Sequence, residues 1–372
     1  MSARFLTAVS GRAFNMRDRF GREIDYMRIS VIDSCNLNCY YCNPQDNNKN
    51  CQAINILSVK KVLCIVRAAT RLGIMHFRLT GGEPLLHPQI DEMVSQIKKI
   101  PSVRSVSLTT NAVLLAQHAK QLKEAGIDSI NVSLDTIDAS EYEHITKKPL
   151  LDKVEHGIDA AIECGIRVKI NAVLTPQTDV VALTRYASKK GTDIRFIEMM
   201  PVGEGHTNGV EPYEKVIGAL LEVYGAPCHI DTENREEINS GYNNADNGPA
   251  EYYSFHGLNI RVGLIQAIHG KFCDTCNRIR VTADGRLMPC LGSSVTMDLV
   301  PDSCEFTDDL EKNFVIVQAL KAAIKAKPGC HNFNDNAVTY TKTTETNTVE
   351  TKTTELKAAE VNAARNMSRI GG

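Results

Sequence analysis

Near its N-terminus the sequence reads Asp33-Ser-Cys-Asn-Leu-Asn-Cys-Tyr-Tyr-Cys42, directly after an apolar, strand-like run at residues 26–32. Its three cysteines, Cys35, Cys39 and Cys42, have the spacing C-x3-C-x2-C. Three thiolates can bind three irons of a 4Fe-4S cluster and leave the fourth iron open to a small molecule. The alternative is a structural zinc site, which usually takes four protein ligands in paired C-x2-C or C-x2-C/His units. The spacing therefore favours an iron-sulfur cluster.

On both sides of this triplet, β-branched or apolar runs alternate with amphipathic helical patterns over about residues 26–200. The predicted strands are 26–32, 75–80, 105–110, 129–134, 167–173 and 193–199, and the predicted helices between them are 58–72, 89–99, 116–125, 152–164 and 179–190. Ser58 suits a helix start, and four glycines fall where helices should stop: Gly73, Gly126, Gly165 and Gly191. Six such repeats imply a parallel sheet, either doubly wound or a complete or partial (β/α) barrel. In both folds the site lies at the C-terminal ends of the strands, where the cysteines are.

Composition limits the class of protein. The chain has 372 residues, is 43% hydrophobic and carries a formal net charge of -2, which suits one large or two medium domains. We expect no nucleic-acid or membrane partner, since no basic excess is present and no apolar run reaches the ~18 residues of a membrane span. The 12 cysteines fall partly into close groups, which indicates metal binding in a reducing cytoplasm rather than disulfides. Residues 1–17, basic and without an acid, predict an N-terminal extension, with a mitochondrial transit peptide as the alternative.

The pattern changes after residue 201. Residues 202–250 are rich in loop residues, strand-like runs follow at 251–256 and 258–265, and a helix is predicted at 309–325. A second cysteine group, Cys273, Cys276 and Cys290, has the spacing C-x2-C-x13-C. A zinc ribbon with Cys304 or His269 as fourth ligand is one interpretation. Beside the first triplet, a second three-cysteine cluster is the better hypothesis, and the two open irons would then face each other.

The C-terminal stretch is compositionally biased. Residues 339–354 hold nine threonines in sixteen positions, interleaved with Lys and Glu. Such a stretch cannot bury a core and predicts a flexible or disordered linker. The chain then closes on Gly371-Gly372.

The first triplet resembles the signature of the radical S-adenosylmethionine (SAM) superfamily. The run Phe272-Cys-Asp-Thr-Cys-Asn-Arg-Ile-Arg-Val-Thr-Ala-Asp-Gly-Arg-Leu-Met-Pro-Cys-Leu291 resembles the C-terminal cluster motif of the GTP 3',8-cyclase family of molybdenum-cofactor biosynthesis. Shorter stretches agree with that family: Phe20-Gly-Arg22, Asp25-Tyr-Met-Arg-Ile-Ser30, Leu79-Thr-Gly-Gly-Glu-Pro-Leu85, Asn131-Val-Ser-Leu-Asp135, Arg195-Phe-Ile-Glu-Met-Met-Pro-Val-Gly203 and the terminal glycines. The resemblance covers about residues 18–333 and 366–372.

The resemblance implies an α/β fold, a partial (β/α)6 barrel of the TIM type closed by a C-terminal iron-sulfur domain. The expected division is an extension at 1–17, the radical SAM core at 18–201, the second-cluster domain at 202–333, the Thr-rich linker at 334–365 and the diglycine tail at 366–372. The implied cofactors are SAM and two 4Fe-4S clusters, one held by Cys35, Cys39 and Cys42 and the other by Cys273, Cys276 and Cys290.

The resemblance also assigns ligand contacts. SAM would contact Gly82, Glu83, Thr109, Asn111, Ser133 and Met200, and GTP would contact Arg28, Arg78, Lys169, Arg195, Arg278 and Arg280. Cations on strands of an otherwise apolar sheet are costly unless paired or bound to an anion, which fits a triphosphate. Catalytic help would come from Arg278, Arg280 and a tail, Gly371 and Gly372, that enters the site. The alternative for the terminal glycines is a frayed chain end, and the motif match favours the functional interpretation.

The implied reaction is radical cyclisation of GTP. A reduced first cluster cleaves SAM to a 5'-deoxyadenosyl radical, which removes the hydrogen at ribose carbon 3'. The carbon radical attacks guanine carbon 8, and an electron and a proton complete (8S)-3',8-cyclo-7,8-dihydroguanosine 5'-triphosphate. The expected partners are an electron donor such as flavodoxin or ferredoxin, the next enzyme, cyclic pyranopterin monophosphate synthase, and a second copy in a homodimer.

The sequence departs from the family pattern at a few positions. His76 stands where the family usually has Lys, so that GTP affinity is expected to be lower or pH-dependent if that position contacts phosphate. Two hypotheses compete with the cyclase. One is another two-cluster radical SAM enzyme, which would modify a peptide or a cofactor, and the other is a non-catalytic binding protein stabilised by zinc or iron-sulfur.

Overall fold

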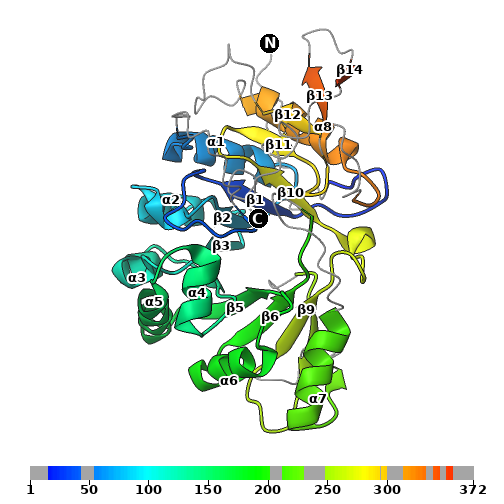
Figure 1. Ribbon diagram of the computed structural model, residues 1–372. Coiled ribbons are helices and arrows are strands. Elements are labelled where there is room, and N and C mark those ends of the chain that lie inside the picture. The colour runs from blue at the N-terminus through cyan, green and yellow to red at the C-terminus, as the bar shows by residue number, and fades with distance from the viewer. Residues whose placement is uncertain are drawn as a thin grey trace, which may run out of the picture.

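The computed structural model of the chain describes residues 16–42, 54–201, 212–229, 248–293, 295–299, 313–331, 338–343 and 349–354. The expected N-terminal extension lies outside these residues except for its last positions, and so does the tail with Gly371 and Gly372. Figure 1 shows the described strands as one sheet, in the order β14-β13-β12-β11-β10-β1-β2-β3-β4-β5-β6-β9-β8-β7.

The six predicted strands form the centre of this sheet. All six run parallel and in chain order: β1 (Tyr26–Ser30), β2 (His76–Thr80), β3 (Ser105–Thr110), β4 (Ser129–Ser133), β5 (Arg167–Val173) and β6 (Asp193–Ile197). A doubly wound sheet reverses its strand order at a switch point, so this order rules that alternative out. The barrel is partial, because β1 and β6 pair with other strands and not with each other.

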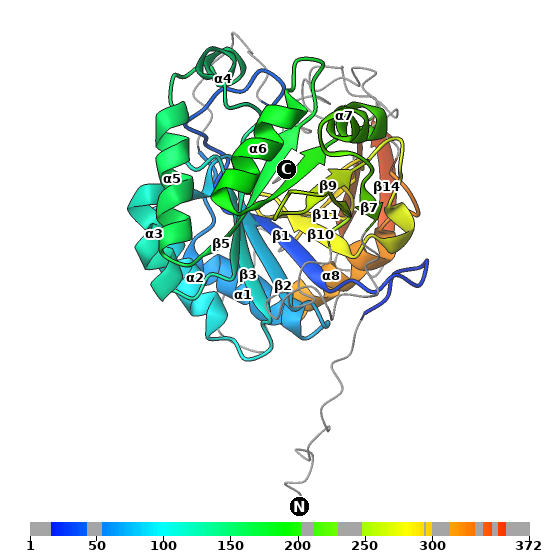
Figure 2. The same ribbon diagram turned by 90° about the horizontal axis from the view of Figure 1, so that it is seen from below.

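The connecting helices cover the outer face of the curved sheet (Figure 2). They are α1 (Val59–Thr70), α2 (Ile90–Lys98), α3 (Leu115–Glu124), α4 (Ala139–Thr146), α5 (Leu151–Glu163) and α6 (Val180–Lys190). Ser58 caps α1 by accepting from the Lys61 N–H at 3.3 Å, as predicted. The predicted glycine stops are confirmed, since each of the four has a positive φ that a side chain disfavours.

Helix α4 is an element that the sequence analysis missed. It is short, and its start is set by the Asp138 side chain, which accepts from the Glu141 N–H at 2.8 Å. An Asp followed by Glu three residues later is a recognised helix-start signal, so the information was present.

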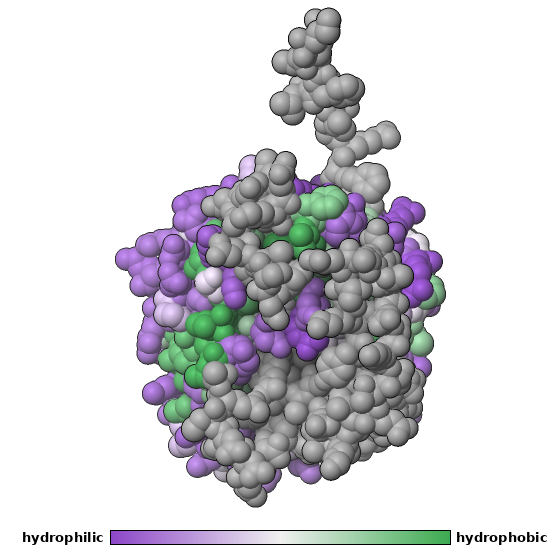
Figure 3. Space-filling model, turned by 90° about the horizontal axis from the view of Figure 1, so that it is seen from above, coloured by the Kyte–Doolittle hydropathy of each residue, from purple (hydrophilic) through white to green (hydrophobic). Residues whose placement is uncertain are grey.

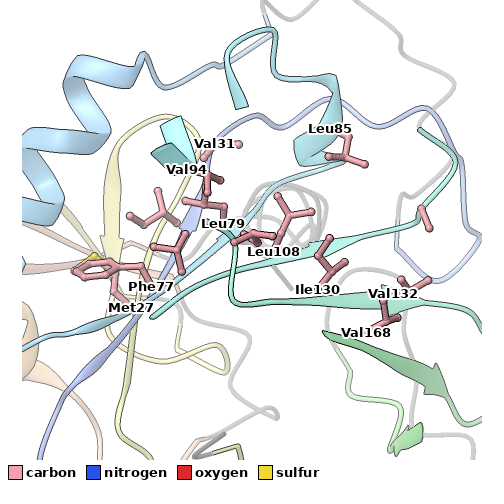
Figure 4. Packing of buried hydrophobic residues seen from close by; sticks show 14 of the residues in the cluster. Met27, Val31, Phe77, Leu79, Leu85, Val94, Leu108, Ile130, Val132 and Val168 are labelled. Atoms are coloured by element: carbon pink, nitrogen blue, oxygen red, sulfur yellow. The ribbon is translucent and has the colours of Figure 1, made fainter. Parts of the chain in front are cut away.

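Alternation along the strands gives the sheet two different faces. Met27, Phe77, Leu79, Leu108 and Ile130 are fully buried and pack in the core under the helices (Figure 4). The residues between them are polar, and they face the inside of the barrel. Buried parallel strands are usually apolar on both faces, so a polar inner face indicates a site. On the face seen in Figure 3, the described residues in view are mostly hydrophilic, with apolar patches between them.

The C-terminal part extends the barrel sheet at both of its edges. Strand β9 (Val262–Ile265) pairs with β6, and β10 (Arg278–Val281) pairs with β1, both in parallel. Residues 266–277 therefore cross from one edge of the partial barrel to the other, and they carry Cys273 and Cys276. Outside β9 lie β8 (Glu251–Ser254) and β7 (Cys228–His229), and outside β10 lie β11 (Arg286–Met288) and β12 (Thr296–Asp298).

Three further helical segments complete this part. A π-helical turn, η2 (Glu214–Gly218), leads into α7 (Ala219–Tyr224), which packs on α6. Helix α8 (Asn313–Ala326) packs on α1. Among the described residues no helix is long and apolar enough to cross a lipid bilayer.

The threonine-rich stretch differs from its prediction. It contains two strands, β13 (Val338–Thr343) and β14 (Val349–Thr354), paired in antiparallel register, and β13 also pairs with β12. The expectation of an unstructured linker is wrong for these segments. Threonine is β-branched and has a high strand propensity, which the composition argument did not weigh.

Candidate active site

A cavity of about 330 Å³ opens where the carboxyl ends of β1–β6 meet the segments that follow β9 and β10. Its walls carry both cysteine groups, so the structure brings together two motifs that are more than two hundred residues apart in sequence. The predicted residues that line it are Cys35, Cys39, Cys42, Cys273, Cys276, Cys290, Gly82, Glu83, Thr109, Asn111, Ser133, Met200, Arg28, Arg78, Arg195, Arg278 and Arg280.

Lys169, an expected GTP contact, and His76, the departure from the family pattern, are not among the residues that line this cavity. Lys169 is 1% exposed and lies on β5 two residues before Asn171, on the same strand face but nearer the N-terminal end of the barrel. Its Nζ is 5.9 Å from the centre of the Tyr252 ring. His76 is likewise at the start of β2, with Nδ1 2.8 Å from the Ser105 hydroxyl, and burial lowers its pKa. The departure at position 76 therefore lies away from the described cavity.

The first cysteine loop is held by the end of α4 and by Asp135, which follows β4. The end of α4 accepts from it twice: Asn38 N–H donates to Thr146 O at 3.0 Å, and Tyr40 N–H to Ile145 O at 3.2 Å. The Tyr41 hydroxyl, between the second and third cysteines, donates to the Asp135 carboxylate. These contacts hold the cysteine loop in place, and none of them was predicted from the sequence.

Burial raises the pKa of two of the thiols of this loop, Cys35 and Cys39. Burial raises the pKa of Cys35 to about 11, although hydrogen bonds from Leu37 and Asn111 lower it. Burial also raises the pKa of Cys39, and Asp135 raises it further. Because metal binding requires thiolates, these thiols would lose their protons only to a positively charged metal group.

Glycines after β2 let the chain pass close to the cysteine loop. Gly82 N–H donates to Ile32 O at 2.7 Å, and Glu83 N–H donates to Ser34 O at 2.8 Å. A Cβ on Gly82 would stand 2.2 Å from Ser34 O, and one on Gly81 would stand 2.4 Å from Ile32 O. Both positions therefore require glycine, because their close neighbour is the backbone that leads into Cys35.

We expect Gly82→Ala to lower the free energy of unfolding by about 2 kcal/mol, since the clash is with backbone that cannot rotate away. The same change is expected to lower iron uptake at Cys35, Cys39 and Cys42. Gly218→Ala is the control, because a Cβ there meets nothing within 4 Å. Equal denaturation midpoints for the two variants would contradict the assigned role of Gly82.

Glu83 organises the carboxyl ends of β2 and β3. Its carboxylate, 1% exposed, accepts from the Thr110 hydroxyl at 2.7 Å, the Asn111 N–H at 2.8 Å and the Leu85 N–H at 3.0 Å. Asn111 in turn donates from its side chain to Asn36 at 2.7 Å and to the Cys35 sulfur at 3.8 Å. Burial outweighs these bonds and raises the pKa of Glu83 to about 7.

This pKa predicts a pH dependence of stability. The folded chain holds the Glu83 proton more tightly than the unfolded chain, whose carboxyl titrates near 4.5. The stabilisation is therefore complete below about pH 4.5 and is lost as the pH rises through about 7, by up to about 3 kcal/mol. Glu83→Gln should flatten this part of the pH profile measured by denaturant unfolding of the cluster-free protein. Glu124→Gln, at an exposed site on α3, should leave it unchanged, and identical profiles for both variants would contradict the prediction.

A cluster of cations lines the cavity on β10, β1 and β2. Arg280, Arg28 and Arg78 are neighbours in register across these three strands. Tyr26 lies on β1 two residues before Arg28. The guanidinium groups of Arg78 and Arg278 are each 5.8 Å from the centre of its ring. Arg78 donates to the Ser107 hydroxyl at 3.0 Å, whereas Nε of Arg28 is buried with no hydrogen-bond partner in the described structure.

The cations disfavour one another's charge. Burial and the neighbouring Arg280 lower the pKa of Arg28 well below its usual value, and burial with Arg278 lowers that of Arg280 to about 10. Burial alone would raise the pKa of Tyr26, but Arg78, Arg28 and Arg278 lower it. Such a cluster of buried cations favours the binding of an anion.

The second cysteine group is supported by residues that the sequence analysis did not single out. Arg22, paired with Asp18 at 2.6 Å, donates to Cys273 O at 2.6 Å. Glu198, at the end of β6, accepts from the Ile268 N–H at 2.6 Å and from His269, and thereby holds the segment before Cys273. His269 is thus a partner of Glu198 through its Nδ1 atom. Lys327 and His331 contact the cysteine sulfurs themselves.

The donor sets suit clusters better than single ions. Among the described residues no group of three His, Cys, Asp or Glu side chains is drawn together as a metal ion requires. In a 4Fe-4S cluster each cysteine binds a different iron, so the sulfurs stand further apart than around one ion. Each group offers three thiols on the wall of a cavity that also holds open space, which fits such a cluster.

Comparisons with known proteins agree with this geometry. Residues 29–183 match the family described as the Radical SAM superfamily, and residues 192–333 match the one described as Molybdenum Cofactor Synthesis C. A GTP 3',8-cyclase of Clostridium perfringens (strain SM101 / Type A) is 36% identical over 322 residues, 86% of this chain and 95% of the relative. A GTP 3',8-cyclase of Listeria monocytogenes (serovar 1/2a) is 36% identical over 320 residues, 85% of this chain and 92% of the relative.

Solved structures support the fold alone. SuiB of Streptococcus suis bound to S-adenosylmethionine matches with a TM-score of 0.53 at 16% identity, over 80% of this chain and 65% of SuiB. SuiB bound to its precursor peptide SuiA matches with a TM-score of 0.52 at 17% identity, over 72% of this chain and 60% of SuiB. The match therefore spans less than two thirds of SuiB, and both structures have the same type of partial barrel.

Proposed function

We propose, since the chain belongs to the GTP 3',8-cyclase family of the radical SAM superfamily, that it cyclises GTP to (8S)-3',8-cyclo-7,8-dihydroguanosine 5'-triphosphate. The reaction would be the first step of molybdenum-cofactor biosynthesis. The observation that carries the proposal is the single cavity lined by two three-cysteine groups and a cluster of arginines.

The arginine cluster supports a triphosphate as the ligand. Three guanidinium groups in register on adjacent strands repel one another, and partial burial makes that repulsion stronger than in water. A nucleoside triphosphate carries about four negative charges and would offset this repulsion, with Arg forks matching its oxygens. Arg195, which donates to Asn171 at 2.9 Å, lies on β6 across the cavity wall and would contact the same ligand.

The cofactors supply the radical chemistry. When bound, a cluster at Cys35, Cys39 and Cys42 with SAM would supply the 5'-deoxyadenosyl radical that takes the 3' hydrogen of GTP. Thr109, Asn111, Ser133, Gly82, Glu83 and Met200 line the same part of the cavity and would orient SAM. The side chain of Glu83 would also fix Thr110 and Asn111, from which it accepts hydrogen bonds.

The second cysteine group would hold GTP next to the first cysteine group. Cys273, Cys276 and Cys290 would bind a second cluster, and Arg278 and Arg280, which follow Cys276 on β10, would contact the nucleotide beside it. Both arginines would stabilise negative charge as ring closure at carbon 8 is completed. Gly371 and Gly372 would enter the site. Lys169, buried on β5, would add positive charge near the GTP phosphates.

The remaining parts of the proposal concern the rest of the chain and its partners. We place the division between the radical SAM core and the second-cluster domain at residue 201, with a diglycine tail at 366–372. The protein would work in the cytoplasm as a homodimer, receive electrons from a flavodoxin or ferredoxin, and pass its product to cyclic pyranopterin monophosphate synthase.

An anaerobic single-turnover assay tests the proposal. The reconstituted protein is mixed with SAM, dithionite and GTP, and the products are read by mass spectrometry. We expect a product isomeric with GTP together with 5'-deoxyadenosine, both lost in Cys35→Ala. Zinc without iron in the purified protein would overturn the radical mechanism, and 5'-deoxyadenosine with unchanged GTP would overturn the substrate.

A further inference from the structure

Lys327, just after the end of α8, is a buried cation with an unusual set of partners. It is 2% exposed. Its Nζ donates to the Cys276 sulfur at 3.4 Å, to Arg278 O at 2.8 Å and to Pro289 O at 3.0 Å. These bonds use all three donors of an ammonium group, and no carboxylate pairs with it within the residues that the structure describes.

The positions of these partners connect the parts of the second cysteine group. Arg278 O lies two residues after Cys276, and Pro289 O lies one residue before Cys290. A single side chain therefore joins the start of β10 to the turn after β11. Because a buried ammonium is costly unless compensated, negative charge on the cysteine sulfurs is its available counterpart.

The backbone around Lys327 is fixed to the same group. Arg22 donates to Pro328 O at 2.6 Å and to Gly329 O at 3.0 Å as well as to Cys273 O. The His331 N–H donates to the Cys273 sulfur at 3.5 Å, and its ring lies 2.7 Å from Ala267 O. The segment 327–331 thus donates to two of the three sulfurs.

We infer that Lys327 is the positioning residue of the second cluster: it holds Cys276 and Cys290 at their mutual spacing and raises the cluster's reduction potential through its hydrogen bond to the Cys276 sulfur. Donors to a ligating sulfur stabilise the more negative, reduced state, which is how such bonds set potentials. This inference rests on the second cluster of the proposed function.

The test uses a protein in which Cys35, Cys39 and Cys42 are all changed to alanine, so that only the second group remains. This background is compared with the same background carrying Lys327→Met, which keeps the side-chain length and removes charge and donors. Lys325→Met is the matched control, an exposed lysine on the same helix. Iron and sulfide per chain are measured after anaerobic reconstitution, and the midpoint potential by a redox titration followed by electron paramagnetic resonance.

We expect about four irons per chain in the background and in Lys325→Met. Lys327→Met should bind less than half of that iron, or bind a cluster that is reduced at least tenfold less favourably, a potential about 59 mV more negative. Lys327→Arg, which keeps the charge and N–H donors, should recover most of the potential. If thermal unfolding shows that Lys327→Met does not fold, Lys327→Gln replaces it, with the same expected shift.

The outcomes separate the inference from the proposed function. Unchanged iron and potential in Lys327→Met or Lys327→Gln would overturn the role of Lys327 and leave the cyclase proposal standing. Zinc without iron in the background protein would overturn the second cluster itself, and with it both proposals.

Discussion

Cys39→Ala is expected to abolish 5'-deoxyadenosine formation and to reduce bound iron from about eight to about four per chain. Cys39 lies between Asp135, Cys35 and Cys42 on the cavity wall, and burial holds its thiol neutral until a metal group takes it. A cluster with only two protein ligands would be lost, and the electron source for SAM cleavage with it. Iron analysis and quantification of 5'-deoxyadenosine after anaerobic reconstitution measure both effects.

Two further cysteine variants make this result specific. Cys164→Ala removes a free, half-buried thiol that is not among the residues lining the cavity, and should change neither measurement. Cys276→Ala should also lose about half of the iron, yet it should still form some 5'-deoxyadenosine without converting GTP. Full iron content in Cys39→Ala would contradict the assignment of the first cluster.

Arg28→Met is expected to weaken GTP binding by about 10- to 100-fold, the loss of a charge-assisted hydrogen bond to phosphate. In the absence of GTP the same variant should be more stable, by about 1 kcal/mol, because a partly buried cation between Arg78 and Arg280 is replaced by an apolar side chain. Weaker GTP binding together with higher stability of the ligand-free protein would indicate that Arg28 serves to bind an anion. Equilibrium dialysis against GTP and denaturant unfolding measure the two effects.

Arg185→Met is the matched control for this prediction. Arg185 is exposed on α6, away from the cavity, and its replacement should affect neither quantity. A stable Arg28→Met protein with unchanged GTP affinity would contradict the proposed triphosphate site. A variant less stable than the parent would show that Arg28 is held by the protein rather than by its ligand.

Much of this fold follows from local pattern. The six barrel strands were predictable because each is a short apolar or β-branched run, and the helices between them carry local start and stop signals at Ser58 and Gly191. The cysteine groups and the strand arginines also showed at the sequence level, since close spacing and cations on strands are visible without a structure. Helix α4 was missed because it is short, although Asp138 marks its start.

The support of the site depends on contacts distant in sequence. Lys327 reaches Cys276 across 51 residues, and Arg22 reaches Cys273 across 251, distances at which no spacing argument applies. Glu83 was expected at SAM, and the structure adds three hydrogen bonds that its carboxylate accepts from Thr110, Asn111 and Leu85. A cation on an inward strand position lines the cavity only if it lies near the C-terminal end of the barrel. The sequence pattern does not give this position, so it could not show that Arg28 lines the cavity and Lys169 does not.

The central claim is that the cavity brings the 3' hydrogen of GTP to the radical that SAM supplies. The most direct measurement is the fate of deuterium in a single turnover with GTP labelled at ribose carbon 3', beside a control labelled at carbon 2'. The account predicts deuterium in 5'-deoxyadenosine from the 3' label and none from the 2' label. Unlabelled 5'-deoxyadenosine from 3'-labelled GTP, formed alongside a cyclised product, would contradict it.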